Sequence, residues 1–137
     1  MNVHHAVGYS SLGAVAIAII VGLFLVGSPE EQRLLGLDRQ RLADLRGLVR
    51  AVESYWEDNS ALPTQLEELV DGRRLSRLPL DPATNVAYEY RATDANGYRV
   101  CANFSVPSAD DTSEDFWFHA AGRHCYSFDL SAIERIE

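Results

Sequence analysis

The sequence predicts an α+β fold, in which a single N-terminal transmembrane helix is followed by an amphipathic helix packed on a small antiparallel β-sheet. Residues 1–29 contain no Asp, Glu, Lys or Arg, whereas all 20 acidic and 12 basic residues follow them. Apolar residues then recur with a helical period, and beyond Asn85 they alternate with polar residues as in strands. These observations divide the chain into an N-terminal tail and anchor over residues 1–27 and an extracytoplasmic domain over residues 28–137.

The predicted anchor is the charge-free run from Ala6 to Gly27. A helix of this length spans about 33 Å, which is enough for a bilayer core of ~30 Å. A cleaved secretory signal needs a basic start and an A-x-A type site, and the sequence shows neither, so we expect an uncleaved helix. Small residues recur at every fourth position along one side: Ala6, Ser10, Ala14, Ala18 and Gly22. We expect this helix-packing face to contact partner helices; the alternative is that small residues are simply common in membrane helices.

An amphipathic helix is predicted to begin directly after the anchor. Ser28, Pro29 and Glu31 have the pattern of a capping box with proline at the first helical position. An apolar stripe follows with alternating spacings of three and four residues: Leu42, Leu45, Val49, Val52 and Trp56. We expect the sheet to cover this stripe, and a coiled-coil seam is the alternative. The charged residues off the stripe are expected to form a solvated surface: Arg39, Arg41, Asp44, Arg46, Arg50 and Glu53.

A short second helix and a turn are predicted before the sheet. Thr64 and Glu67 form another capping box, and Gly72 ends the helix. Further on, the Asp81 carboxylate is placed to accept hydrogen bonds from nearby backbone N–H groups, while Pro82 sets φ and Asn85 takes the left-handed conformation. These last three residues are therefore predicted to be structural-turn residues rather than parts of an active site.

Three or four antiparallel strands are predicted after this turn. Residues 86–91 and 98–106 alternate between apolar and polar positions, and the sequence "TDANG" between them is typical of a hairpin turn. Residues 116–120 and 123–129 supply the remaining strands, joined through Ala121 and Gly122. The apolar faces of these strands are expected to lie against the amphipathic helix.

Both cysteines are predicted to lie on the polar side of this sheet. Cys101 shares its strand face with Arg99, and Cys125 shares its face with Ser127. A buried free thiol would lie on the apolar side, so we expect a Cys101–Cys125 disulfide and an oxidising compartment. The arginines that follow the anchor instead favour a cytoplasmic domain by the positive-inside rule. We give the disulfide more weight and expect a single-pass protein of the bacterial inner membrane, with its C-terminal domain in the periplasm.

The chain resembles the major pseudopilins of type II secretion systems and type IV pilin-like proteins over about residues 38–106. The resemblance rests on a long apolar helix running into an amphipathic helix, then on "AVESYWEDNSALPTQLEEL", "LPLDPATNVAYEY" and "YRVCANF" in that order. It implies a helix backed by a small antiparallel sheet, an extracytoplasmic domain and a structural role. The prepilin cleavage signal is not recognisable, since no basic leader precedes Gly8 and Gly13 stands where pilins usually have glutamate.

We therefore expect a non-catalytic accessory or structural subunit of a larger membrane complex, whether respiratory, photosynthetic or secretory. It would contact other membrane-protein subunits and the lipid bilayer. A pseudopilin that assembles into a type II secretion or type IV pilus-like filament is the first alternative, and a metal- or ligand-binding periplasmic domain is the second. The net charge of −8 and the lack of a basic cluster in the sequence exclude a nucleic acid as partner.

No cofactor is expected, although two weak metal candidates stand in the sequence. The acidic loop with Asp110, Asp111 and Asp115 could hold calcium but lacks the regular alternation of an ion-binding loop. His119, His124 and Cys125 lack a fourth ligand for a zinc site.

Overall fold

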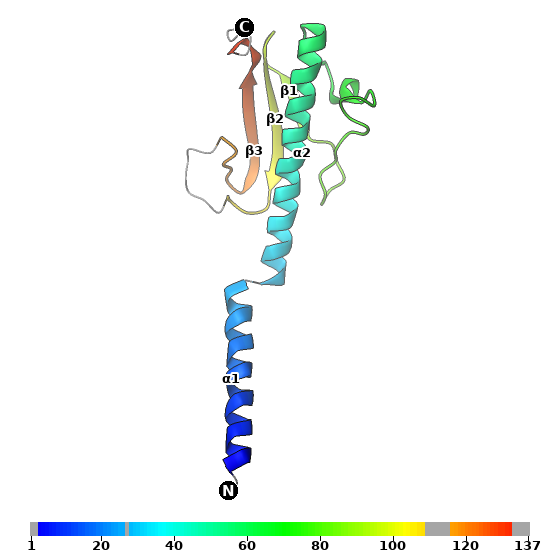
Figure 1. Ribbon diagram of the computed structural model, residues 1–137. Helices are drawn as coiled ribbons and strands as arrows, with labels where there is room; N and C mark the ends of the chain where they lie inside the picture. Colours follow the sequence, from blue (N-terminus) through cyan, green and yellow to red (C-terminus); the bar gives the residue numbers. More distant parts are fainter. Residues whose placement is uncertain (1–2, 27, 109–115, 133–137) are drawn as a thin grey trace. The chain divides into compact units, whose positions relative to one another are not determined.

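In the computed structural model the backbone is described for residues 3–26, 28–108 and 116–132, and the side chains for residues 12–23, 28–108 and 116–131. The elements are α1 (Val3–Val26), α2 (Pro29–Asn59), the 3₁₀ helix η1 (Leu66–Leu69), β1 (Glu89–Ala92), β2 (Gly97–Phe104), β3 (Gly122–Asp129) and the 3₁₀ helix η2 (Leu130–Ala132) (Figure 1). The chain divides into two compact units, Met1–Leu34 and Leu35–Glu137, and each is described by itself.

The transmembrane anchor predicted over residues 1–27 is wrong. The region forms the helix α1, yet none of the helices in the described residues is long and apolar enough to cross a membrane. The prediction rested on the absence of charge, and a charge-free run is not by itself a continuous apolar span: Gly8, Tyr9, Ser10 and Ser11 interrupt its first half. The localisation as a single-pass inner-membrane protein with a periplasmic domain therefore loses its support, as does the description of the fold as membrane-anchored and pseudopilin-like.

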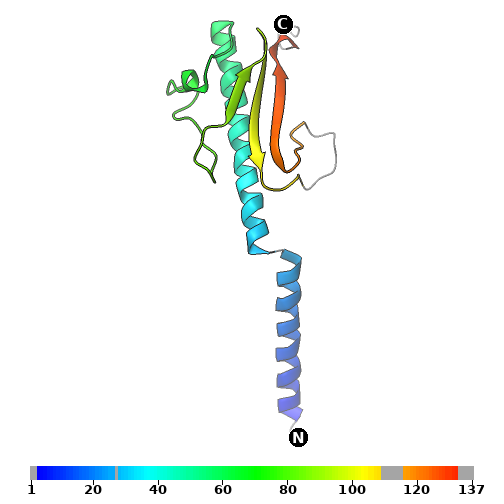
Figure 2. The same ribbon diagram turned by 180° about the vertical axis from the view of Figure 1, so that it is seen from behind.

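Helix α2 begins with the capping interaction that its sequence predicts. The backbone N–H of Glu31 donates to Ser28 Oγ at 3.2 Å, which satisfies one of the donors left open at a helix start. In the second unit the apolar side of α2 faces the sheet (Figures 1 and 2). Leu45, Leu48 and Val52 have no exposed surface, and burial of each such side chain stabilises the fold by about 1.5–3 kcal/mol.

The sheet has the order β1-β2-β3 with both pairs antiparallel. The central strand β2 turns its apolar side chains toward α2, and these residues are all buried: Tyr98, Val100, Ala102 and Phe104. The first strand is shorter than predicted because it begins at Glu89; Val86, expected to face inward, is 62% exposed.

Residues 116–120 do not form the predicted additional strand. Their aromatic rings instead pack on the rings of β3, with Trp117 4.8 Å from Tyr126 and Phe116 5.1 Å from Phe128 between ring centroids. The Tyr126 hydroxyl also donates to the backbone oxygen of Trp117 at 2.9 Å. Ring packing and this hydrogen bond hold the segment in a conformation other than a ladder-forming strand.

The predicted short helix is present only as the 3₁₀ turn η1. Its capping carboxylate belongs to Glu68 rather than Glu67, since Glu68 Oε1 accepts from the N–H groups of Thr64 at 3.1 Å and Gln65 at 3.3 Å. Leu66 and Leu69 are buried, whereas Val70 is 39% exposed. The segment contributes two core side chains and then returns to irregular structure.

Candidate functional site

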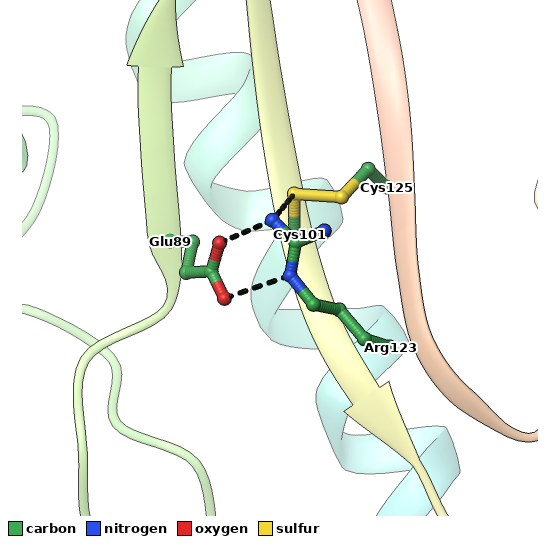
Figure 3. Close-up of a disulfide and its surroundings, with 4 residues drawn as sticks. All are labelled: Glu89, Cys101, Arg123 and Cys125. Carbon is green, nitrogen blue, oxygen red and sulfur yellow. Dashed lines mark hydrogen bonds and ion pairs between the residues drawn. A yellow bond between two sulfur atoms is a disulfide. The ribbon is translucent and has the colours of Figure 1, made fainter.

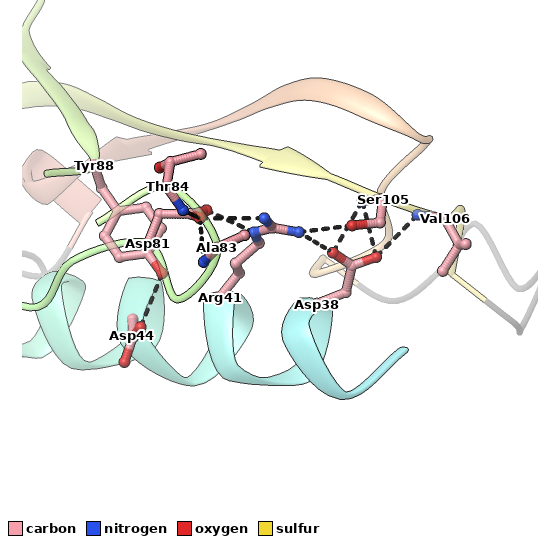
Figure 4. Close-up of polar contacts among 9 residues, drawn as sticks. All are labelled: Asp38, Arg41, Asp44, Asp81, Ala83, Thr84, Tyr88, Ser105 and Val106. Atoms are coloured by element: carbon pink, nitrogen blue, oxygen red, sulfur yellow. Dashed lines mark hydrogen bonds and ion pairs between the residues drawn. The ribbon is translucent and has the colours of Figure 1, made fainter. Parts of the chain in front are cut away.

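A buried polar cluster surrounds the guanidinium group of Arg41 (Figure 4). We call Arg41, Asp38, Asp81 and Ser105 the Arg41 cluster; its arginine is only 4% exposed. Arg41 Nε and Nη2 donate to the two oxygens of Asp81 at 2.6 and 3.2 Å. Arg41 Nη1 donates to Asp38 Oδ1 at 2.7 Å and to Ser105 Oγ at 2.8 Å. One side chain of α2 therefore joins the loop around residue 81 and the segment after β2.

The structural turn predicted around residue 81 supplies one carboxylate of this cluster. Asp81 Oδ1 accepts from the N–H groups of Ala83 at 2.9 Å and Thr84 at 3.0 Å, and Asn85 takes a positive φ of 58°. The Arg41 guanidinium, helped by these N–H groups, lowers the pKa of Asp81 to about 2 against burial, which acts in the opposite direction. Asp81 is thus ionised throughout the neutral range.

The second carboxylate of the cluster holds the end of the central strand. Asp38 Oδ1 accepts from the Ser105 N–H at 2.9 Å, and Asp38 Oδ2 accepts from the Val106 N–H at 2.9 Å. These two donors follow directly after β2, which ends at Phe104, so the carboxylate replaces the ladder partners that the strand loses there. Every carboxylate oxygen in the cluster accepts at least one hydrogen bond.

The Arg41 cluster is suited to holding segments together rather than to chemistry. A carboxylate with a pKa near 2 is a poor general base at neutral pH, and its oxygens are already occupied by donors within the protein. Arg41 was expected on a solvated surface, and that prediction is wrong. The only sequence signal was the opposite charge of Asp38 three residues earlier on the same helix face; nothing in the sequence pointed to Asp81 or Ser105 as partners.

An open groove of about 560 Å³ lies along α2 beside residues 74–80. Its lining residues are Gln40, Ala43, Asp44, Gly47, Arg74, Leu75, Ser76, Arg77, Leu78, Pro79, Leu80 and Asn85. Asp44 in its wall accepts from the Tyr88 hydroxyl at 2.8 Å and from Gln40 Nε2 at 2.9 Å. Burial and the Asp44 carboxylate raise the pKa of Tyr88 well above its usual range. The Tyr88 hydroxyl and the Asp44 carboxylate are hydrogen-bonded to each other. This wall of the groove therefore also joins α2 to the segment that leads into β1.

The predicted disulfide is formed between Cys101 and Cys125 on the outer face of the sheet (Figure 3). The two cysteines are directly opposite each other in the β2–β3 register, as two residues on one face of paired strands must be to form a bridge. Arg123 donates through Nε and Nη2 to Glu89 at 3.0 and 2.6 Å, and its Nη2 lies 3.6 Å from Cys101 Sγ. This face therefore carries the disulfide and, next to its Cys101 sulfur, the ion pair between Arg123 and Glu89.

His119 and His124 do not combine with Cys125 as a metal site. His119 is 3% exposed and stacks on Phe104 with 3.7 Å between ring centroids, while the Cys125 sulfur is part of the disulfide. Burial lowers the pKa of His119, and its Nδ1 has no hydrogen-bond partner among the described residues. Within the described residues no group of three or more His, Cys, Asp or Glu side chains could hold a metal ion. The calcium candidates Asp110, Asp111 and Asp115 lie outside the described residues.

Helix α1 carries the residues of the predicted packing face. Ala14, Ala18 and Gly22 lie in its described part, and the side chains of Ala6 and Ser10 lie outside it. Over residues 12–23, the part of α1 whose side chains are described, these large aliphatic side chains are half exposed or more: Leu12, Val15, Ile17, Ile19, Ile20, Val21 and Leu23. These side chains follow one another too closely to occupy a single stripe, so apolar surface surrounds this part of the helix.

No family model, no curated protein and no solved structure matches this chain. The pseudopilin resemblance of the sequence accordingly remains a prediction.

Proposed function

We propose that this protein is a non-catalytic structural subunit that joins a larger protein assembly through helix α1. The partners are apolar helices of other subunits. The observation that carries the proposal is the exposure of aliphatic side chains along α1, which reaches 68% at Leu12 and 69% at Leu23. Folded proteins rarely leave a large contiguous apolar surface in water, and such surfaces typically mark interaction sites.

The chemistry of the helix surface favours another helix as the partner. Ala14, Ala18 and Gly22 follow one another at intervals of four residues, so they share one side of the helix. A side-chain carbon added at Gly22 would meet nothing within 4 Å, which leaves that side open to close approach. The distance between two packed helices depends on the side chains at their contact, and small residues here allow a short one. The aliphatic side chains beside them would then lose their contact with water.

The second unit supports a scaffold role for the rest of the chain. The Arg41 cluster, the Tyr88–Asp44 hydrogen bond and the disulfide each join segments that are distant in sequence. Side chains held in this way keep a fixed surface for contact with neighbours. Their polar groups are hydrogen-bonded to other groups of the same chain, which fits a structural role.

The test is the mass and composition of the protein purified from its native source under mild conditions, measured by size-exclusion chromatography with light scattering. We expect a complex of fixed stoichiometry, well above the 15.2 kDa of the chain. Ile17→Asp should release the chain from this complex, because Ile17 is 64% exposed on α1. Val86→Asp is the matched control, since Val86 is 62% exposed in the second unit.

A wild-type protein that runs alone at its own mass would overturn the proposal, as would equal loss of the complex in both variants. If the protein instead forms a regular polymer that contains only this chain, the proposed role changes from a subunit of a mixed complex to a self-assembling subunit. Circular dichroism of both variants checks that the second unit stays folded.

A further inference from the structure

Two arginines face each other on the outer side of the sheet. The β1–β2 register pairs Arg91 with Arg99 directly, and both lie on the face that carries Cys101, because positions two apart in a strand share a face. Side chains directly opposite in antiparallel strands have Cβ atoms about 4.5–5.5 Å apart, and like charges in such pairs destabilise the sheet. The arrangement therefore has a cost unless a negative charge lies between the two guanidinium groups.

Among the described residues no carboxylate forms an ion pair with either of these two arginines, whereas Arg41, Arg73, Arg74 and Arg123 all take part in ion pairs. Acidic residues outnumber basic ones by 20 to 12 in the whole chain, so the lack of a partner does not reflect a shortage of carboxylates. Glu89 is on the same face and its charge acts on Arg99, but both of its oxygens accept hydrogen bonds from Arg123.

A pocket of about 280 Å³ lies over this pair of arginines. Its lining residues are Glu89, Tyr90, Arg91, Arg99, Cys101 and Arg123. Three of these carry a positive charge and one a negative charge, so the lining has a formal charge of +2 in a protein whose net charge is −8. A concave, locally positive surface attracts small anions, even on a protein that is acidic as a whole.

We propose that this pocket binds a phosphate-class dianion between Arg91 and Arg99. The planar guanidinium group presents paired N–H donors that match the oxygens of phosphate, and hydrogen bonds between two charged groups are the strong ones. A dianion balances the formal charge of +2 on the lining, whereas a monoanion would balance only half of it. Glu89 does not oppose the ligand fully, because the Arg123 guanidinium holds its carboxylate. The volume of the pocket accommodates the free ion or the phosphoryl end of a monoester.

Titration of the full-length protein with inorganic phosphate, by calorimetry at constant ionic strength with chloride as the replaced ion, tests the site. We expect saturable binding by the wild type. Arg99→Gln should weaken it about tenfold or more, as expected for the loss of a charge-assisted hydrogen bond. Arg91→Gln should do the same. Arg39→Gln is the matched control, since Arg39 is an exposed arginine of α2 and its replacement should leave the affinity unchanged.

Thermal unfolding separates a binding site from a general charge effect. Without phosphate, Arg99→Gln should melt at a higher temperature than the wild type, because it removes the repulsion between the two arginines. With phosphate, the wild type and the Arg39→Gln variant should gain more stability than Arg99→Gln does. An Arg99→Gln variant that melts below the wild type and binds phosphate equally well would overturn the proposal, as would absence of saturable binding by the wild type.

Two further ligands identify the chemical class and its source. Phenyl phosphate that binds more tightly than inorganic phosphate would assign the site to a phosphorylated molecule, and equal affinity would assign it to the free ion; both outcomes support the pocket. Succinate that binds as tightly as phosphate would overturn the assignment to a phosphate-class ligand.

Discussion

Replacement of Arg41 by methionine tests whether the buried polar cluster holds the second unit together. The change removes the guanidinium group and keeps a side chain of similar length, so the Asp38 and Asp81 carboxylates remain buried without a cation. Loss of one partner of a buried ion pair typically costs about 3–5 kcal/mol, because it leaves uncompensated charge behind. We expect Arg41→Met to lower the free energy of unfolding by about that amount at pH 7.

Asp81 alone accounts for part of this loss in the free energy of unfolding. Its pKa falls from the ordinary 3.8 to about 2 in the folded protein, and each pKa unit corresponds to about 1.4 kcal/mol, so ionised Asp81 contributes about 2 kcal/mol to stability at neutral pH. The folded-state pKa is the lower one. The contribution is therefore fully present above pH 3.8 and is lost as the pH falls toward 2.

The pH dependence distinguishes this cause from a simple packing defect. Between pH 4 and pH 2 the wild type should lose about 2 kcal/mol that Arg41→Met does not lose, so the two proteins should converge in stability as the solution becomes more acidic. Urea unfolding followed by circular dichroism at several pH values measures the difference. Arg39→Met, at an exposed position of the same helix, should change stability by less than about 0.5 kcal/mol. An Arg41→Met variant no less stable than Arg39→Met, or one that runs parallel to the wild type below pH 4, would refute the reasoning.

Two further predictions concern the disulfide and the buried histidine. Reduction of Cys101–Cys125, or its replacement by two alanines, should lower stability by about 3 kcal/mol, since the bridge closes a loop with a sequence separation of 24; an unchanged urea midpoint after reduction would contradict this. Burial lowers the pKa of His119; the backbone of Ala120 and the Asp38 charge oppose the shift, and His124 adds to it, so the unfolded chain binds the proton more readily. Stability should then fall as the pH drops below about 6.5, and His119→Phe should remove that part of the pH dependence in the same urea titration. A wild type whose stability is flat between pH 7 and pH 5 would be the opposing result.

Local features of the fold could be predicted from the sequence because they depend on neighbouring residues. The cap of α2 needs only Ser28 and the N–H of Glu31, and the turn at Asp81 is closed by the N–H groups of Ala83 and Thr84. The disulfide followed from strand alternation, which placed both cysteines on one face. In each case the controlling interaction is within a few residues or follows from a fixed period.

Predictions failed where the outcome depended on side-chain contacts between different segments. The segment 116–120 has the composition of a strand, yet its rings pack on Tyr126 and Phe128 instead of forming a ladder. The transmembrane prediction for residues 1–27 failed for a different reason, since a segment without charges is not necessarily long and apolar enough to cross a membrane. Absence of charge is compatible with several environments for a helix and does not by itself show that the helix spans a membrane.

The sequence by itself determined where α2 starts, where the chain turns before the sheet and that the two cysteines share a face. Only the tertiary structure decided that Arg41 is buried and bonded to residues 40 and 64 positions away, that Arg91 and Arg99 oppose each other and that His119 lies under Phe104. Periodicity tells which side of an element a residue occupies. It does not tell which other element covers that side, and burial, pairing and pKa all depend on that second element.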